Sequence, residues 1–390
     1  MVRKFRIENW HRKIVTKRTL LKALSFVDAH PDLRTPVLLM DKEKILENAS
    51  LVGKTIPNSH VFYAVKANAD KAVLSLLKDK EIGFEIASEG ELDLLIDLNI
   101  SPERIITSNP IKSVPFIQKA YHYGVRYFAF DSLTELRKLE KYAPGCEVYV
   151  RLAVPNEGSE WPLSKKFGVE LDEAFILLQE AKKKNKVNPT GITFHVGSQC
   201  LNVYNWYIAI EKAKQLWQRC AEAGIELKML NIGGGYPINY TRVAPDIKEV
   251  EAYISRFLKE KFSDKIEVFI EPGRAIVGDA GIMVARVLGK AVRNYENWLY
   301  LDVGVFNGLM ESLGGIKYTY IPEEATHASS SYKKWTVAGP SCDSMDVIAK
   351  HVDLPEVDEG MLVLILSAGA YTVSYASEFN GFPIPEVILI

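Results

Sequence analysis

The run His60-Val61-Phe62-Tyr63-Ala64-Val65-Lys66-Ala67 is apolar, rich in β-branched and aromatic residues, and carries a lysine near its end. Runs of this kind are typical of buried strands. Seven more follow it, separated by longer amphipathic stretches, at residues 83–87, 104–107, 127–130, 148–152, 191–194, 229–232 and 268–270. Eight strands that alternate with helices predict a (β/α)8 TIM barrel.

The stretches between the runs have the features of helices. Ser88 with Glu91 three residues later forms a capping box, and residues 208–223 carry apolar side chains at helical spacing. An open doubly wound sheet is the alternative fold. It is disfavoured because no G-x-G-x-x-G motif follows the first run.

Beyond Arg274 the helical stretches fade and β-type runs succeed one another, at residues 281–288, 298–303, 335–338, 361–366 and 386–390. They predict a C-terminal all-β domain. Residues 1–35 do not follow the barrel pattern, and we assign them to the same domain. The expected division is therefore a barrel over residues 36–275, with residues 1–35 and 276–390 forming a β-rich domain.

The composition is that of a soluble globular chain: 390 residues, 47% hydrophobic and 25% charged. A net charge of -1 supplies no long-range field for nucleic acid or acidic lipid, so we expect neither partner. The N-terminus leads into no apolar signal segment, and the strongest apolar run, 361–366, is too short to span a bilayer. Four cysteines without paired spacing indicate no metal site and a reducing, cytoplasmic location.

Residues suited to catalysis occur where the predicted strands end, which is where barrel enzymes build their active sites. Lys66 ends the first strand, and Arg151 ends the fifth. Burial of an ammonium depresses its pKa, and the resulting amine is nucleophilic enough for Schiff-base chemistry. The alternative is that Lys66 only reaches solvent at a strand end.

Four further features accompany this lysine. Gly233-Gly234-Gly235 offers bare amides for a phosphate, or is only a tight turn; Arg274 adds a forked cation. His195 is a flat ring at a strand end, or a satisfied core histidine. Glu271 is a carboxylate at the rim, or half of a salt bridge to a neighbouring strand. Together they indicate a site for a phosphorylated aromatic aldehyde, pyridoxal 5'-phosphate.

The chain resembles the fold-type III pyridoxal-phosphate decarboxylases, which include ornithine, diaminopimelate and arginine decarboxylases, and in particular their bacterial ornithine/lysine branch. The matching motifs are YAVKAN (63–68), EWPLSKKFG (160–168), HVGS (195–198), GGGYP (233–237), EPGR (271–274), LDVGVFNGL (301–309), GPSCD (339–343), GAYT (369–372) and FNGF (379–382). The resemblance implies an alanine racemase-like barrel followed by a β domain.

The resemblance also implies roles for single residues. Lys66 would carry the cofactor as a Schiff base, His195 would stack on its ring, and Glu271 would pair with the protonated pyridine nitrogen. The residues implied to hold the phosphate are Ser198, Gly235, Arg274 and Tyr371. We add Arg151, Gly233 and Gly234 to the cofactor-binding residues because of their positions at strand ends.

In this family two subunits share their active sites, so the resemblance implies a homodimer. Cys342 and Asp343 would enter the partner's site, where Cys342 protonates the carbanion left by carbon dioxide and Asp343 binds the substrate's distal ammonium. An amino-acid racemase is one alternative, but the known alanine racemases have an arginine at the position that corresponds to Glu271. A catalytically inactive regulatory homologue is another, although all the expected catalytic residues are present.

The substrate is predicted from the same region. Cys342-Asp343 follows the diamine-forming pattern rather than the Cys-Glu pattern of diaminopimelate decarboxylases. Where eukaryotic ornithine decarboxylases have a Tyr-Asp specificity pair, this chain reads Leu313-Gly314-Gly315. Glu311 is the candidate replacement, with a solvated loop acid as the alternative, and Tyr371 is a further candidate for the substrate. We predict decarboxylation of L-ornithine to putrescine, in polyamine biosynthesis, with L-lysine or a related diamino acid as the alternative.

Overall fold

The computed structural model describes residues 3–162, 166–262, 265–324 and 332–390. The chain packs into two compact units. The first comprises Ala49–Pro237 and Pro245–Gly273, and the second comprises Met1–Asn48, Ile238–Ala244 and Arg274–Ile390. Each unit has its own sheet, so each is described separately.

The first unit is a closed barrel of parallel strands in the order β10-β11-β2-β3-β4-β5-β6-β8. The strands are β2 (Ser59–Ala64), β3 (Gly83–Ile86), β4 (Ile105–Thr107), β5 (Tyr127–Phe130), β6 (Glu147–Arg151), β8 (Asn188–Thr193), β10 (Met229–Asn231) and β11 (Glu267–Ile270). Every predicted run corresponds to one of these strands, which confirms the barrel. A short antiparallel pair, β7 (Ser159–Trp161) with β9 (Ser198–Cys200), is added to it.

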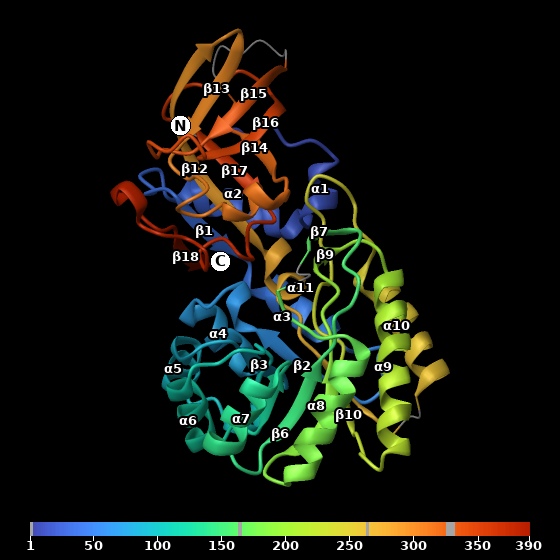
Figure 1. Ribbon diagram of the computed structural model, residues 1–390. Helices are drawn as coiled ribbons and strands as arrows, with labels where there is room; N and C mark the ends of the chain where they lie inside the picture. Colours follow the sequence, from blue (N-terminus) through green and yellow to red (C-terminus); the bar gives the residue numbers. More distant parts are fainter. Residues whose placement is uncertain (1–2, 163–165, 263–264, 325–331) are drawn as a thin grey trace. The chain divides into compact units, whose positions relative to one another are not determined.

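A helix connects each barrel strand to the next, and Figure 1 shows these helices around the strands. They are α4 (Lys71–Lys78), α5 (Glu89–Asp97), α6 (Val114–Tyr123), α7 (Leu133–Tyr142), α8 (Leu171–Lys184), α9 (Tyr204–Glu222) and α10 (Ile247–Lys261). The predicted cap is present, because the Ser88 hydroxyl accepts a hydrogen bond from the Glu91 amide at 3.3 Å.

Apolar side chains from six of the strands form a cluster that fills the barrel: Phe62, Ile106, Ala129, Tyr149, Met229 and Phe269. Such a packed interior is a core and not a pore. Polar side chains that follow the strands therefore gather at the carboxyl end of the barrel, with the apolar cluster below them.

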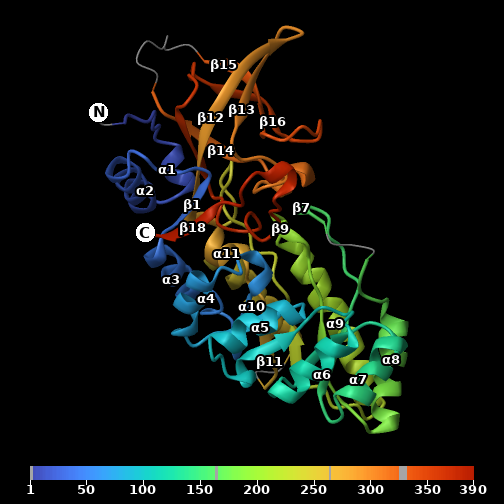
Figure 2. The same ribbon diagram turned by 90° about the vertical axis from the view of Figure 1, so that its left-hand side faces the viewer.

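The second unit is built on a mixed sheet whose longest strand is β12 (Gly281–Arg293). The first half of β12 pairs with β1 and β17, and the second half pairs with β13 across a register shift between Val287 and Gly289 (Figures 1 and 2). The other strands are β1 (Val37–Met40), β13 (Glu296–Leu301), β14 (Thr319–Pro322), β15 (Lys333–Ala338), β16 (Val347–Leu354), β17 (Leu362–Leu366) and β18 (Glu386–Leu389).

The N-terminal part of the chain differs from its predicted structure. Strand β1 pairs with β12 and β18, so the barrel unit begins at Ala49 rather than at residue 36. Residues 1–35 contain the helices α1 (His11–Ile14) and α2 (Lys17–Ala29). The buried α2 residues Leu20, Ala23 and Val27 have helical spacing and join the core of the second unit.

Three further elements are α3 (Lys42–Leu51), whose residues are divided between the two units, α11 (Arg274–Val277) and the 3-10 segment η4 (Met310–Gly314). Of the helices in the described residues, none has the length and hydropathy needed to cross a bilayer.

Candidate active site

Lys66 lies in the 3-10 turn η1 (Val65–Ala67), which directly follows β2. Its Nζ donates a hydrogen bond to Glu85 Oε2 at 2.6 Å, and Glu85 is buried on the neighbouring strand β3. The Lys66 side chain remains 46% exposed. The apolar burial expected from the sequence is therefore not found: an ion pair holds the amine at the open end of the barrel.

Glu271 follows β11 and is buried beside two neutral donors. Its Oε1 accepts a hydrogen bond from Asn231 Nδ2 at 2.5 Å and another from the Ser108 hydroxyl. The Ser108 hydroxyl also contacts the Tyr149 hydroxyl at 2.8 Å. Within the described residues no hydrogen bond reaches Oε2 and no cation forms an ion pair with this carboxylate. The alternative interpretation of Glu271, a salt bridge to a neighbouring strand, is therefore not found among the described residues.

The surroundings of Glu271 disfavour its charge. Burial raises its pKa, and the nearby carboxylate of Glu85 raises it further, although Lys66 and the two neutral donors act in the opposite direction. A buried carboxylate with one engaged oxygen is suited to a ligand that brings its own N–H group and positive charge.

His195 follows β8 as a neutral ring. Its Nδ1 accepts a hydrogen bond from the Gly197 amide at 3.0 Å, so in the neutral imidazole the proton is assigned to Nε2. Burial lowers the pKa of His195, and the positive charges of Arg151 and Lys66 lower it further. An uncharged flat ring beside these cations is suited to packing against an aromatic cofactor.

The turn at 233–235 can be made only by glycine. Gly235 has φ +97°, and a Cβ atom on it would lie 2.4 Å from the carbonyl oxygen of Gly197. A Cβ atom on Gly234 would lie 2.4 Å from the carbonyl oxygen of Glu271. Among the described residues, nothing accepts a hydrogen bond from the amides of Gly234 and Gly235. Ser198 begins β9 beside this turn, and the two amides are suited to donating hydrogen bonds to an anion.

The remaining site candidates belong to the second unit, where Arg274 and Glu311 form a buried ion pair. Arg274 Nη1 and Nη2 donate to Glu311 Oε2 and Oε1 at 2.8 and 2.7 Å, and each side chain is only 3% exposed. Nη1 also donates to the Tyr240 hydroxyl, and the Tyr371 ring centroid lies 4.9 Å from Arg274 Cζ. Glu311 is therefore not a solvated loop acid.

Cys342 and Asp343 lie in an exposed loop of the second unit, and Cys342 is the exposed one among four free cysteines. The Cys342 amide donates to Asn380 Oδ1 at 3.0 Å. The buried carboxylate of Asp346 accepts hydrogen bonds from the amides of Val305 at 2.7 Å and Ser341 at 2.9 Å. These contacts fix both ends of the loop.

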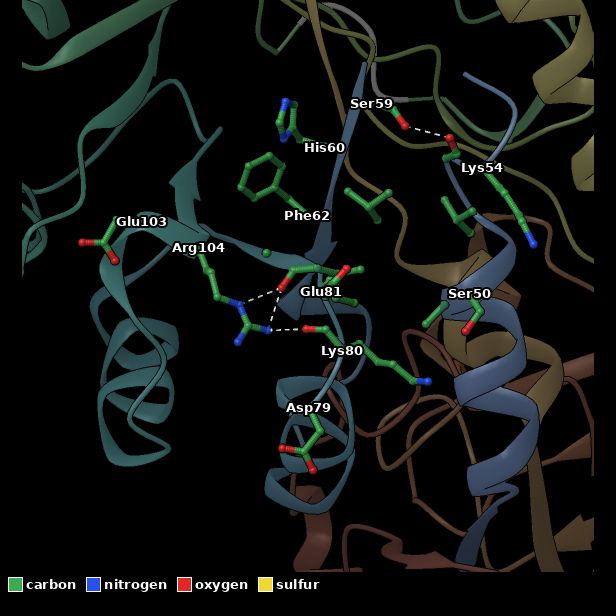
Figure 3. Close-up of a pocket in the computed structure, with 16 residues that line it drawn as sticks. Ser50, Lys54, Ser59, His60, Phe62, Asp79, Lys80, Glu81, Glu103 and Arg104 are labelled. Atoms are coloured by element: carbon green, nitrogen blue, oxygen red, sulfur yellow. Dashed lines mark hydrogen bonds between the residues drawn. The ribbon is translucent and has the colours of Figure 1, made fainter. Parts of the chain in front are cut away.

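A pocket lies at the other end of the barrel, where β2 and β3 begin. Figure 3 shows this pocket of about 720 Å³, which is lined by the first residues of β2 together with Lys54, Asp79 and Arg104. The Arg104 guanidinium is engaged by the backbone carbonyls of Lys78, Lys80 and Ile82. In Figure 3 the other charged groups point in different directions, so they do not converge on one ligand.

Three residues around Glu271 were missed by the sequence reasoning: Ser108, Tyr149 and Asn231. Ser108 directly follows a predicted strand, so the strand-end criterion could have included it. Asn231 is a polar residue inside an apolar strand, which is a weaker signal. Residues 163–165 of the EWPLSKKFG motif lie outside the described residues.

The comparisons with known proteins agree with this geometry. The family model "Pyridoxal-dependent decarboxylase, pyridoxal binding domain" matches residues 42–278. The lysine/ornithine decarboxylase of Selenomonas ruminantium is 34% identical over 357 residues, which cover 91% of this chain and 89% of the relative. The crystal structure of a lysine/ornithine decarboxylase from Vibrio vulnificus complexed with cadaverine has a TM-score of 0.86 and 30% identity, and the match covers 97% and 100% of the two chains. A Paramecium bursaria Chlorella virus arginine decarboxylase has a TM-score of 0.88 and 28% identity over 95% of this chain and 100% of its own.

Proposed function

This chain belongs to the pyridoxal-dependent decarboxylases, and we propose that within the family it decarboxylates L-ornithine to putrescine and carbon dioxide. As a pyridoxal-phosphate-dependent carboxy-lyase it acts on a basic amino acid. The proposal concerns which amino acid it prefers and which residues carry out the reaction.

The buried carboxylate of Glu271 is the observation on which the proposal depends. When bound, the cofactor supplies an electron sink for the pair of electrons left on the substrate as carbon dioxide departs. Glu271 Oε2 would accept a hydrogen bond from the pyridine nitrogen and keep a proton there. A carboxylate at this position favours decarboxylation over racemisation, because an arginine would not hold that proton.

The other barrel residues fit the remaining parts of the cofactor. The Lys66 amine would bond to the aldehyde carbon, and the neutral His195 ring would pack on the heterocycle. The amides of Gly234 and Gly235 would donate to the phosphate, with Ser198, Arg274 and Tyr371 as the other phosphate ligands and Arg151 and Gly233 lining the cofactor.

We further propose that the active unit is a homodimer in which each subunit's 342–343 loop completes the partner's site. Cys342 and Asp343 are exposed, and so are the apolar side chains of Met345 and Phe379 near them. A thiol and a carboxylate amid exposed apolar side chains are suited to an interface. There Cys342 would donate a proton to the substrate Cα, and Asp343 would bind the distal ammonium.

L-lysine is the second candidate substrate, because the Selenomonas relative is a lysine/ornithine decarboxylase. The two amino acids differ by one methylene, which a pocket distinguishes by about 1–3 kcal/mol. Cys342-Asp343 supports a basic substrate in either case.

The test is carbon dioxide release by the full chain with pyridoxal 5'-phosphate, using L-ornithine, L-lysine, L-arginine and meso-diaminopimelate. We expect the highest kcat/KM with L-ornithine and no release by Lys66→Ala. A higher kcat/KM with L-lysine would show that L-lysine, rather than L-ornithine, is the preferred substrate. Racemisation of the amino acids without carbon dioxide release, or no cofactor absorbance at all, would refute the decarboxylase assignment.

A further inference from the structure

We propose that Glu311 is a positioning residue for the cofactor phosphate: it holds the Arg274 guanidinium in the orientation in which Arg274 binds that phosphate. This inference rests on the proposed function, which makes Arg274 and Tyr371 phosphate ligands. It replaces the expectation that Glu311 binds the substrate's distal ammonium.

The contact between the two side chains fixes the plane of the guanidinium. Both carboxylate oxygens of Glu311 accept from terminal nitrogens of Arg274, at 2.8 and 2.7 Å. Two parallel hydrogen bonds between planar groups fix orientation as well as distance, which a single contact does not. Since both side chains are 3% exposed, solvent does not compete for this geometry.

Aromatic rings fix the guanidinium on its other sides. Arg274 Cζ lies 4.9 Å from the Tyr371 ring centroid and 5.6 Å from that of Tyr240. The Tyr240 hydroxyl accepts from Nη1, and the Tyr240 carbonyl is itself held by the Thr319 hydroxyl at 2.7 Å. Because Arg274 packs on Tyr371, a fixed guanidinium also fixes a second phosphate ligand.

The same geometry disfavours Glu311 as the group that recognises the substrate. Its carboxylate is neutralised by Arg274 and buried, whereas the carboxylate of Asp343 lies in an exposed loop. A distal ammonium binds best to a carboxylate whose charge is not already balanced. Asp343 meets that condition and Glu311 does not.

Two roles of Glu311 predict opposite effects on phosphate binding. If it positions Arg274, its neutralisation leaves a buried guanidinium that turns toward other acceptors, and phosphate binding weakens. If it only opposes the phosphate charge, its neutralisation strengthens the attraction between Arg274 and the phosphate. Geometry with both oxygens engaged favours the first role.

The experiment measures the dissociation constants of pyridoxal 5'-phosphate and of pyridoxal for the apoprotein, by absorbance or fluorescence titration. The dissociation constant of pyridoxal divided by that of pyridoxal 5'-phosphate is the phosphate ratio, and this ratio isolates the contribution of the phosphate to binding. We expect Glu311→Gln to reduce this ratio by about tenfold or more, the loss of a charge-assisted contact, and to leave pyridoxal affinity within about threefold. Glu311→Asp keeps the charge but is one methylene shorter, and it should reduce the ratio by a smaller factor.

The matched control is Glu135→Gln in the barrel, which disrupts a buried ion pair with Lys112 at 3.1 Å, with side chains 2% and 0% exposed. It should lower stability without changing the ratio. An unchanged or larger ratio in both Glu311 variants would overturn the inference. A second outcome would also overturn it: a KM for L-ornithine raised more than tenfold at saturating cofactor, with the phosphate ratio unchanged. That result would assign Glu311 to substrate binding. If the wild type bound no pyridoxal phosphate, the proposed function would fail first and this inference with it.

Discussion

Two buried carboxylates, Glu271 in the barrel and Glu311 in the second unit, are held in opposite ways. Glu271 is held by neutral donors on one oxygen, whereas Glu311 is held on both oxygens by a guanidinium. A buried charge without a counter-ion is costly, and the cost falls when a cation arrives. Glu271 is therefore ready for a cationic ligand, while Glu311 already has its cation and acts on its partner's position.

The largest expected difference is in catalysis. Glu271→Gln should reduce kcat by about 10²–10³-fold, the effect of losing one aligned electrostatic partner, because an amide does not keep a proton on the pyridine nitrogen. Rapid-quench carbon dioxide assays at saturating cofactor measure it. Borohydride trapping should still label Lys66, which shows that the cofactor is bound. A kcat within tenfold of the wild type would remove Glu271 from its proposed role.

For the unfolding free energy, the larger loss is expected at Glu311 rather than at Glu271. Glu311→Gln leaves the Arg274 charge buried without its partner and should cost the apoprotein about 3–5 kcal/mol of unfolding free energy. Glu271→Gln removes a buried charge that has no paired cation and should therefore raise the unfolding free energy of the apoprotein. Urea unfolding at one protein concentration measures both. Equal losses in the two variants would show that the carboxylates do not differ in this way.

The pH dependence should sharpen the comparison further. Since burial raises the pKa of Glu271 above its ordinary value of 4.5, its protonated form stabilises the folded apoprotein below that pH, and this contribution is lost as pH rises through the folded-state pKa. The unfolding free energy of the wild type relative to Glu271→Gln should therefore fall with rising pH, by at most about 1.4 kcal/mol per unit. If the unfolding free energy of the wild type relative to Glu271→Gln rose with pH above 4.5, the pKa of Glu271 would not be raised in the folded protein.

The smallest effect is expected at Tyr240. Tyr240→Phe removes the hydroxyl that accepts from Arg274 but keeps the ring and the ion pair with Glu311. Loss of one hydrogen bond worth about 0.5–1.5 kcal/mol should raise the dissociation constant of pyridoxal 5'-phosphate by about two- to tenfold. An effect as large as that of Glu311→Gln would mean that the hydroxyl, rather than the carboxylate, orients the guanidinium.

The barrel could be predicted because its strands are short, apolar and regularly spaced, and Lys66, His195 and Glu271 each stand where a strand ends. The partners of these residues could not be predicted. Asn231 and Ser108 meet Glu271 only because β10, β11 and β4 open onto the same end of the barrel. The pairing of Glu311 with Arg274 joins residues far apart in sequence, and no local pattern marks it. Strand β1 was missed because it precedes the regular alternation of strands and helices, and because its partners β12 and β18 lie far from it in the sequence.

The carboxylate of Asp346 has a consequence for how two subunits would meet. Gly304 and Gly339 close around it so tightly that a Cβ atom on either would come within 2.2 or 2.3 Å of its Oδ1. The Cys342 segment is therefore already ordered in a single subunit, and its backbone would lose little conformational entropy if two subunits associated. A side chain at either glycine would clash with the Asp346 carboxylate, and we therefore expect it to disturb the Cys342 segment that the proposed interface would use.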